Sequence, residues 1–326
     1  MGWTGEDCVP AEVRAWMRRR TSRAADWPAR ALAEAKGDTT VSVVLPARDE
    51  RETVGDIVRV IRGELAALVD EVVVIDSRST DDTAAVAARA GARVHAQDDI
   101  LPHLEPLGGK GEALWKSLAV TEGDILAFVD ADIRNFRSEL VTGLLGPLLS
   151  DPGVVYVKGC YDRPLGGAPT GGGRVTELVA RPLINLHWPH LSGFVQPLAG
   201  EYAGRRAALE RVPFITGYGV ELGLLVDLAE LAGLDALAQV DLGVREHSHQ
   251  STEALGAMAA QIMLAAWSRL ERQGKIQAAH RPGSRLTQFR RGEHGHEAVV
   301  QDVSIAERPP MSTVRTPRPG RATGRP

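Results

Sequence analysis

Two aspartates, Asp130 and Asp132, end the apolar run in the segment GDILAFVDADIRN, with a single alanine between them. In an extended strand, residues two apart lie on the same face, so both carboxylates should point to one side. Like charges repel at this spacing, and a shared divalent cation that prefers oxygen ligands, Mg²⁺ or Mn²⁺, removes the repulsion. The alternative is a polar strand end with solvated acids. An Asp-x-Asp pair alone is a weak signal, and its position at the end of a buried strand strengthens it.

Two further segments carry polar residues suited to a phosphorylated ligand. The run DSRSTDD (76–82) ends one apolar stretch and begins a helical one. Ser79 or Thr80 could cap that helix, or the run could hold a ribose or a base. The segment GGKGEAL places Lys110 at a helix entrance, where backbone amides and an ammonium suit a diphosphate. It lacks the spacing of a Walker loop, and no Gly-x-Gly-x-x-Gly follows the first strand. These absences argue against a P-loop nucleoside triphosphatase and a dinucleotide oxidoreductase.

The elements that position these residues alternate between short apolar runs and amphipathic stretches. Alternation of this kind predicts an α/β fold with a mostly parallel sheet that is covered on both faces. Ligands of such sheets bind at the carboxyl ends of the strands, where acidic side chains should gather at one rim. We predict strands at 41–46, 71–76, 92–96 and 124–130, helices at 53–65, 79–91 and 109–120, and rim acids at Asp49, Glu50, Asp76, Asp130 and Asp132.

Beyond residue 150 the pattern is less regular. Residues 10–36 favour helix, and the stretch from Arg308 to Pro326 is typical of a disordered tail. We predict further strands at 153–161 and 237–249 and helices at 217–233 and near 252–272. The expected organisation is an N-terminal helical segment (1–37), a nucleotide-binding half (38–150), a second half (151–300) and a flexible C-terminal tail (301–326).

The composition indicates which kinds of binding partner and which cellular compartment to expect. A net charge of -4 over 326 residues favours neither a general nucleic-acid binder nor a membrane-surface protein. No apolar stretch is long enough to span a bilayer, and the first residues do not resemble a signal peptide. Cys8 and Cys160 lie far apart, as expected for two free thiols in a reducing compartment. We therefore expect a cytoplasmic protein.

The motifs together resemble a known family. In this order, VSVVLPARDE, VVVIDSRSTDDT, GKGEALWKSL and FVDAD resemble the GT-A glycosyltransferases. More specifically, GGGRVTELVARPL, QPLAGEYAGRR, GYGVELGLLVD and QVDLGVREH resemble the glucosyl-3-phosphoglycerate synthases of actinobacteria, a retaining family. The resemblance covers roughly residues 38–275, with LTQF and ERPPM near the end. It implies a GT-A fold, with a Rossmann-like nucleotide-binding half on a mostly parallel central sheet and a C-terminal acceptor-binding half.

The resemblance also implies an activity and a set of roles. The family transfers glucose from UDP-glucose to 3-phosphoglycerate with Mg²⁺ or Mn²⁺, as the first step towards methylglucose lipopolysaccharides, and its members are homodimers. By the same resemblance, Asp132 and His247 are the metal ligands, and Glu221, Lys110 and Asp130 are the catalytic residues. The implied nucleotide-sugar site holds Pro46, Ala47, Arg48, Asp49, Glu50, Ser77, Lys110, Asp130, Ala131, Tyr218, Glu221 and Arg245, and the implied acceptor site holds Gly173, Arg174, Thr176 and His249.

The sequence departs from the family pattern in four places. Arg78 stands where glycine is usual, Ala131 replaces a serine, His249 replaces an asparagine, and the loop before TGGGR is shortened. Alternative interpretations are a mannosyl-3-phosphoglycerate synthase that uses GDP-mannose, a nucleotidyltransferase, and a catalytically silent GT-A binding module. Individually, Glu221 could be an ordinary helix-start acid and Arg174 a solvated residue.

Overall fold

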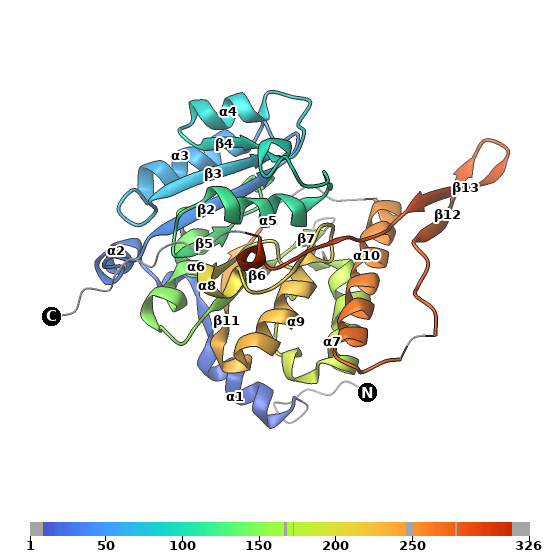
Figure 1. The fold of residues 1–326 in the computed structure, drawn as a ribbon. Helices are drawn as coiled ribbons and strands as arrows, with labels where there is room; N and C mark the ends of the chain where they lie inside the picture. The colour runs from blue at the N-terminus through green and yellow to red at the C-terminus, as the bar shows by residue number, and fades with distance from the viewer. Residues whose placement is uncertain (1–8, 166–167, 172, 246–250, 278, 315–326) are drawn as a thin grey trace.

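The structure is a computed structural model that describes residues 9–165, 168–171, 173–245, 251–277 and 279–314. Its centre is an eight-stranded sheet in the order β1-β11-β6-β9-β5-β2-β3-β4 (Figure 1). The strands of this sheet are β1 (Thr21–Arg23), β2 (Val41–Ala47), β3 (Glu71–Asp76), β4 (Arg93–Ala96), β5 (Ile125–Phe128), β6 (Tyr156–Asp162), β9 (Tyr202–Arg205) and β11 (Leu237–Val244).

The nucleotide-binding half has the predicted alternation of strands and helices. Strands β4, β3, β2 and β5 pair in parallel, so their carboxyl ends lie at one edge. The sheet is covered on both faces, and apolar residues of alternate register enter two separate hydrophobic cores. The helices of this half are α3 (Val54–Glu64), α4 (Thr83–Arg89), α5 (Lys110–Val120) and α6 (Ser138–Ser150). The predicted α/β architecture is therefore confirmed.

The second half continues the same sheet. β9 pairs antiparallel with both β5 and β6, so it joins the strands of the two halves. This antiparallel strand was not predicted. Other helices of the chain are α1 (Ala11–Arg20), α2 (Ala29–Ala35), α7 (Arg181–His187), α8 (Arg206–Leu209), α9 (Val220–Ala232) and α10 (Thr252–Arg272).

Two terminal segments differ from the expectations. Residues 10–36 are not all helical, because Thr21–Arg23 forms edge strand β1 in parallel with β11. Near the other terminus, β14 (Glu307–Arg308) pairs antiparallel with β10 (Phe214–Ile215), and the Met311 side chain is fully buried. The prediction of a flexible tail from residue 301 is therefore wrong for residues 301–314, because apolar and ion-pairing side chains of this segment pack on the body. Residues 315–326 lie outside the described part.

A hairpin projects from the body of the molecule. It consists of β12 (Arg285–Gly292) and β13 (Gly295–Asp302), paired over their whole length beside α10 (Figure 1). Its side chains include exposed apolar residues, among them Phe289 at 67% and Val300 at 54%. A two-stranded hairpin has little stability by itself, and exposed apolar side chains on it are typical of a contact surface.

The glycines at the start of α5 allow two backbone segments to approach each other closely. Gly109 has a φ of 100°, in the region that favours glycine. A Cβ atom at Gly109 would overlap the carbonyl oxygen of Thr216, and one at Gly111 would overlap that of Ile215. The amide of Glu112 also donates to the Thr216 carbonyl at 3.3 Å. The motif was predicted to bind phosphate, and its glycines also let α5 pack directly against the loop before α9.

We predict that Gly111→Ala destabilises the protein strongly, because its methyl group must displace backbone atoms that no side-chain rotation can move. The expected loss in the free energy of unfolding is about 2–4 kcal/mol, at the upper end of common single substitutions. Urea unfolding followed by circular dichroism measures it. Gly63→Ala, on α3 where an added Cβ meets open space, is the matched control and should change stability by less than about 1 kcal/mol. Equal effects of the two substitutions would contradict the prediction.

Candidate active site

A cavity of about 660 Å³ opens at the carboxyl ends of the parallel strands. It brings together segments from both halves of the chain, as the fold class predicts. The predicted site residues that line it are Pro46, Ala47, Arg48, Glu50, Ser77, Lys110, Asp130, Ala131, Asp132, Gly173, Arg174, Thr176, Tyr218, Glu221 and Arg245. His247 and His249 lie outside the described residues, so their predicted roles stay predictions.

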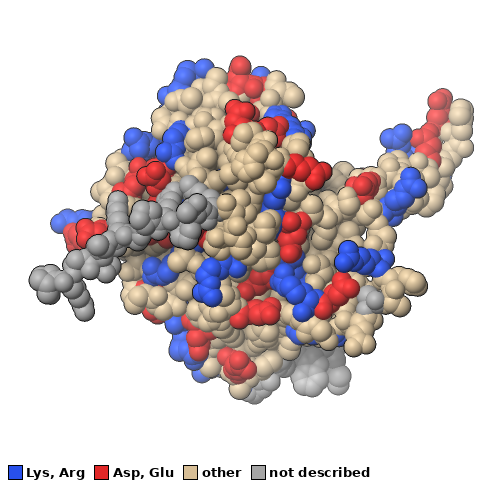
Figure 2. Space-filling view, viewed as in Figure 1, with Lys and Arg blue, Asp and Glu red and all other residues tan. Residues whose placement is uncertain are grey.

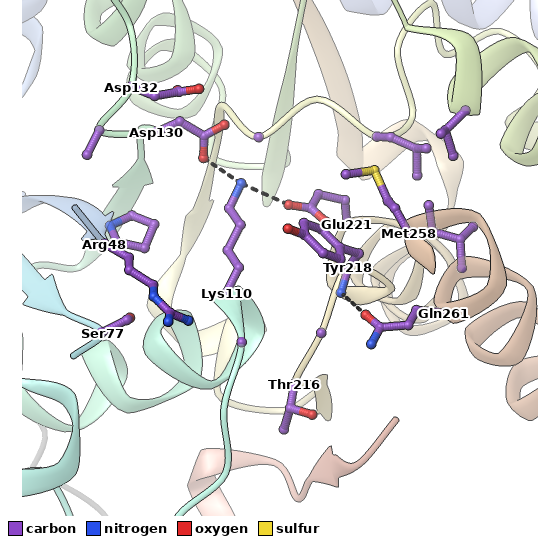
Figure 3. A pocket seen from close by; sticks show the side chains of 18 of the residues that line it. Arg48, Ser77, Lys110, Asp130, Asp132, Thr216, Tyr218, Glu221, Met258 and Gln261 are labelled. Carbon is purple, nitrogen blue, oxygen red and sulfur yellow. Dashed lines mark hydrogen bonds and ion pairs between the residues drawn. The ribbon is translucent and has the colours of Figure 1, made fainter. Parts of the chain in front are cut away.

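Lys110 lies at the centre of the cavity between two carboxylates. Its Nζ atom is 2.5 Å from Asp130 and 3.0 Å from Glu221, which come from opposite sides of the site (Figure 3). Burial alone would lower the pKa of Lys110, but the two carboxylates outweigh it and raise the pKa. Burial likewise opposes ionisation of Asp130, yet Lys110 and Arg245 hold its pKa well below the usual range. Lys110 and Asp130 are therefore both charged at neutral pH.

Arg245 makes a second set of ion pairs beside this cluster. Its Nη2 atom donates to Asp132 at 2.6 Å and to Asp130 at 3.1 Å. Its Nη1 atom donates to the Tyr161 hydroxyl at 2.8 Å and lies 2.9 Å from a carboxylate oxygen of Glu201. Burial would lower the pKa of this guanidinium, but the surrounding anionic groups, Glu201 foremost, raise it. Arg245 is thus fixed by groups behind the cavity and presents its charge to the rim acids.

Several residues that shape the site were not predicted from the sequence to be site residues. Glu201 is fully buried, and a Cβ atom at Gly200 would overlap Asp130 and come within 2.7 Å of the Lys110 ammonium. Both residues lie in the segment QPLAGEYAGRR, which carried only the family resemblance. A glutamate directly before a strand, as at Glu201, is a sequence signal that could have indicated a site residue. Gln97 and Gln261 also line the cavity, and nothing in their sequence context distinguishes them from surface glutamines.

Oxygen donors for a cation gather near Asp132. Its side chain is 32% exposed and lines the cavity together with Asp130 and Glu50. Burial, followed by repulsion from Asp132, raises the pKa of Glu50 to about 7. Carboxylates that repel one another in this way fit a hard divalent cation. Within the described residues no group of three His, Cys, Asp or Glu side chains is arranged to hold a metal ion by itself.

The loops after β2 and β3 are joined by side-chain hydrogen bonds. The Asp49 carboxylate accepts hydrogen bonds from the Thr80 amide at 2.6 Å and the Thr80 hydroxyl at 3.1 Å, and the Asp49 amide donates to Ser79 at 3.0 Å. Asp49 is not among the residues lining the cavity, so its carboxylate holds the neighbouring loop. The predicted Ser79 or Thr80 cap of α4 is wrong, because Asp81 accepts the hydrogen bond from the Thr83 amide instead.

Three of the predicted acceptor residues, Gly173, Arg174 and Thr176, line the same cavity. Gly173 has a φ of 77°, which favours glycine, and Arg174 begins the helical turn that follows. The Nη1 atom of Arg174 lies 3.5 Å from the hydroxyl of Thr252, at the start of α10. Thr176 is buried against the cavity wall. This segment therefore offers a backbone turn, a guanidinium and a hydroxyl to one ligand.

The helix after Arg174 does not bury the residues that its sequence spacing suggests. At the spacing of an α-helix Val175 and Leu178 would share one face, but the Leu178 side chain is 76% exposed whereas Val175 is buried. The cause is the π-helical stretch Thr176–Ala180, which precedes α7. A π-helix has more residues per turn than an α-helix, so positions that share a face at α-helical spacing separate.

The surface around the site carries both signs of charge. On the face in Figure 2, basic and acidic side chains are interspersed. No helix within the described residues is long and apolar enough to cross a membrane. The expectation that nucleic acid is not a partner stays a prediction.

Comparison with known proteins identifies close relatives. The family model of Glycosyl transferase family 2 matches residues 42–197. A glucosyl-3-phosphoglycerate synthase of Mycolicibacterium smegmatis is 48% identical, over 92% of this chain and 98% of its own length. The enzyme of the same name from Mycobacterium tuberculosis strain H37Rv is 44% identical, over 89% of this chain and 90% of its own length.

Solved structures match over almost the whole chain. The Mycobacterium tuberculosis glucosyl-3-phosphoglycerate synthase in complex with Mn²⁺, UDP and glucosyl-3-phosphoglycerate is 44% identical, with a TM-score of 0.79, and the match covers 89% of this chain and 96% of that one. A mannosyl-3-phosphoglycerate synthase from Rubrobacter xylanophilus is 40% identical, with a TM-score of 0.88, over 94% and 100% of the two chains. The predicted GT-A fold is thereby confirmed.

We predict that Lys110→Met destabilises the protein more at pH 7.5 than at pH 4.5. Lys110 is one of the two cations that hold the pKa of Asp130 below its usual range, so the pKa of Asp130 rises in the folded variant. The penalty therefore grows as the pH rises towards the raised pKa of the folded variant and has its full size above that value. We expect a loss of about 1–3 kcal/mol at pH 7.5. Urea unfolding at the two pH values measures it.

Lys110→Arg is the control, because it keeps the positive charge and should lose less stability at pH 7.5. A loss that is equal at both pH values would mean that Lys110 acts through packing and not through its charge.

Proposed function

The chain belongs to the family of glucosyl-3-phosphoglycerate synthases, and on that premise we propose that it transfers glucose from UDP-glucose to 3-phosphoglycerate with Mg²⁺ or Mn²⁺. One observation carries the proposal: two anion-binding arrangements face a single cavity. Lys110 and the rim acids line this cavity, and so do Gly173 and Arg174 of the turn that begins the next helix. A donor diphosphate and an acceptor phosphate would then meet across the cluster of Lys110, Asp130 and Glu221.

The donor fits along the carboxyl edge of the sheet. Pro46–Arg48 and Ser77 would contact the nucleoside, and Lys110 the diphosphate. Lys110 is the first residue of α5, so the positive end of the helix dipole and the ammonium would favour the same anion. When the glycosidic bond to the diphosphate breaks, negative charge develops on the leaving oxygen, and Lys110 would stabilise it.

A divalent cation would be held by Asp132, with Glu50 close by. When bound, such a cation neutralises the diphosphate as a Lewis acid. Arg245 pairs with Asp132 at 2.6 Å and also with Asp130 and Glu201, so these acids hold its guanidinium in place beside the residues that would bind the cation. His247 remains our proposed second ligand, on the family resemblance alone.

Retention of configuration is part of the proposal. A covalent route would need a carboxylate free to attack the sugar. Asp130 and Glu221 are both ion-paired with Lys110, which reduces their nucleophilicity. We therefore favour transfer on one face of the sugar, in which the leaving diphosphate takes the proton of the acceptor hydroxyl while Lys110 and Arg245 hold the surrounding charges in place.

The donor sugar has a second candidate. The Rubrobacter xylanophilus structure with a TM-score of 0.88 is a mannosyl-3-phosphoglycerate synthase, which favours testing GDP-mannose as donor. Glucose is our first choice, because the two curated relatives described above are glucosyl enzymes at 44% and 48% identity.

We further propose a homodimer located in the cytoplasm. The projecting hairpin, with Phe289 and Val300 exposed, supports a contact between two copies of the chain. A mass of one chain by analytical ultracentrifugation at micromolar concentration would exclude the dimer. The cytoplasmic location rests on the two distant cysteines of the sequence.

Transfer assays with purified protein test the function. We expect glucosyl-3-phosphoglycerate from UDP-glucose and 3-phosphoglycerate in Mg²⁺ or Mn²⁺, less or no product from GDP-mannose, and none after a chelator removes the metal. Asp132→Ala should lose at least about a hundredfold in turnover, because an electrostatic contact to the reacting charge is removed. Asp151→Ala, outside the cavity, is the control for a surface aspartate. Full activity of Asp132→Ala in Mg²⁺ would contradict the metal assignment.

Arg174 tests the acceptor side. Arg174→Ala should raise the KM for 3-phosphoglycerate or lower turnover by about tenfold or more, because a planar guanidinium that grips phosphate is lost. Arg174→Lys should restore activity only in part, since an ammonium cannot form two parallel hydrogen bonds. The dissociation constant of UDP, measured by calorimetry, should be unchanged in both variants. Weaker UDP binding with unchanged acceptor kinetics would place Arg174 in the donor site.

A further inference from the structure

The order of the strands allows distances along the cavity to be estimated. From the strand that carries Asp130, the order runs β5-β2-β3-β4, all parallel. Neighbouring strands lie about 4.8 Å apart, so the ends of β3 and β4 are roughly 10 and 14 Å from the end of β5. A nucleoside diphosphate with its phosphates at Lys110 and the rim acids therefore extends its base toward the loops after β3 and β4.

Those two loops form a fixed wall at that end of the cavity. Gln97, after β4, is 2% exposed and lines the cavity. Its Oε1 atom accepts a hydrogen bond from the Ser77 hydroxyl at 3.0 Å, and its Nε2 atom donates to the Leu107 carbonyl at 3.0 Å. The Lys116 ammonium donates to the Gln97 carbonyl at 2.8 Å. Because both ends of the Gln97 amide are engaged by protein, this wall cannot adjust easily to a larger ligand.

Arg78 extends the wall in an unusual conformation. Its φ is 63°, in the left-handed region that an arginine rarely adopts. Its Nε and Nη2 atoms donate to the two carboxylate oxygens of Asp98 at 2.7 and 3.1 Å, which bridges the two loops. Such a half-exposed ion pair contributes little to stability, so it does not account for the strained backbone. Strain of this kind is concentrated at ligand sites, and Arg78 lines the cavity.

We propose that Arg78, held by Asp98, selects the base of the nucleotide donor. The pair closes the end of the cavity next to Ser77 and Gln97, where a single pyrimidine ring fits and a bicyclic purine must displace the pair. Within the described residues the Nη1 atom of Arg78 has no hydrogen-bond partner, and it can donate to a pyrimidine carbonyl. The inference rests on the proposed use of a nucleotide sugar and adds the residue that decides which nucleotide.

The first experiment measures binding, which does not depend on the acceptor or on the sugar. Calorimetry with UDP and with GDP in Mg²⁺ gives the ratio of their dissociation constants for the wild type and for Arg78→Gly. Glycine suits the positive φ and removes the side chain, so the fold should be retained. We expect the preference for UDP over GDP to fall by about tenfold or more, the effect of losing a hydrogen bond to a charged group.

Two further variants separate position from charge. Asp98→Asn keeps Arg78 but weakens the ion pair that positions its guanidinium. It should lower the preference for UDP over GDP by a smaller factor than Arg78→Gly. Arg93→Ala is the matched control. Arg93 lies on β4 and also pairs with an acid, Glu71 of β3, at 2.7 Å, but it does not line the cavity. Its ratio should match that of the wild type.

A wild-type preference for GDP, or an equal loss of UDP and GDP affinity in Arg78→Gly, would overturn the inference. The same ratio measured as kcat/KM with UDP-glucose and GDP-glucose extends the test to transfer. If UDP binds selectively but no transfer to 3-phosphoglycerate occurs, the proposed function fails while the base selection by Arg78 stands.

Discussion

The contact of Lys110 with both Asp130 and Glu221 is the interaction on which the site depends. Asp130 follows β5 in the nucleotide-binding half, and Glu221 lies in the first turn of α9 in the other half, so one ammonium holds acids from both. Around it, the carboxylates of Asp130, Asp132, Glu201 and Glu221 are ion-paired with Lys110 or Arg245, and the buried Lys158 ammonium interacts with three of these acids. A donor diphosphate would bring more negative charge to the same place, and a divalent cation would offset it.

That contact is possible only because three backbones approach closely. Gly109 and Gly111 bring α5 against the residues before α9, and Gly200 leaves room beside Asp130 for the Lys110 ammonium. Strand β9, which begins two residues after Gly200, pairs with both β5 and β6. The acids and the cation are therefore positioned by the sheet and by glycines, with little left to the freedom of long side chains. This is the preorganisation that electrostatic stabilisation of a leaving group requires.

The sequence predicted the nucleotide-binding half well, because its signals are local. Uniformly apolar strands and amphipathic helices alternate from residue 41 to 130, and the motif residues stand at the ends of these elements. Antiparallel β9 was missed because pairing with distant β5 and β6 leaves no mark on a four-residue segment. The exposure of Leu178 could not be predicted from its spacing, because it lies in a π-helical stretch. Glu201 and Gln97 were missed because burial of a polar side chain depends on its partners, which only the folded chain brings together.

The C-terminal segment belongs to the same arrangement. Arg308 donates to both carboxylate oxygens of Glu112 at 2.8 Å, and Glu112 lies in the first turn of α5, two residues after Lys110. One residue earlier, Glu307 pairs with Arg269 of α10, which pairs with Asp227 of α9 at 2.6 Å. These ion pairs link the helix that begins with Lys110 to the helix that carries Glu221. Buried ion pairs add little net stability, but they penalise any arrangement that separates their partners. The chain after the projecting hairpin therefore specifies the relative position of two helices, and with it the distance between Lys110 and Glu221.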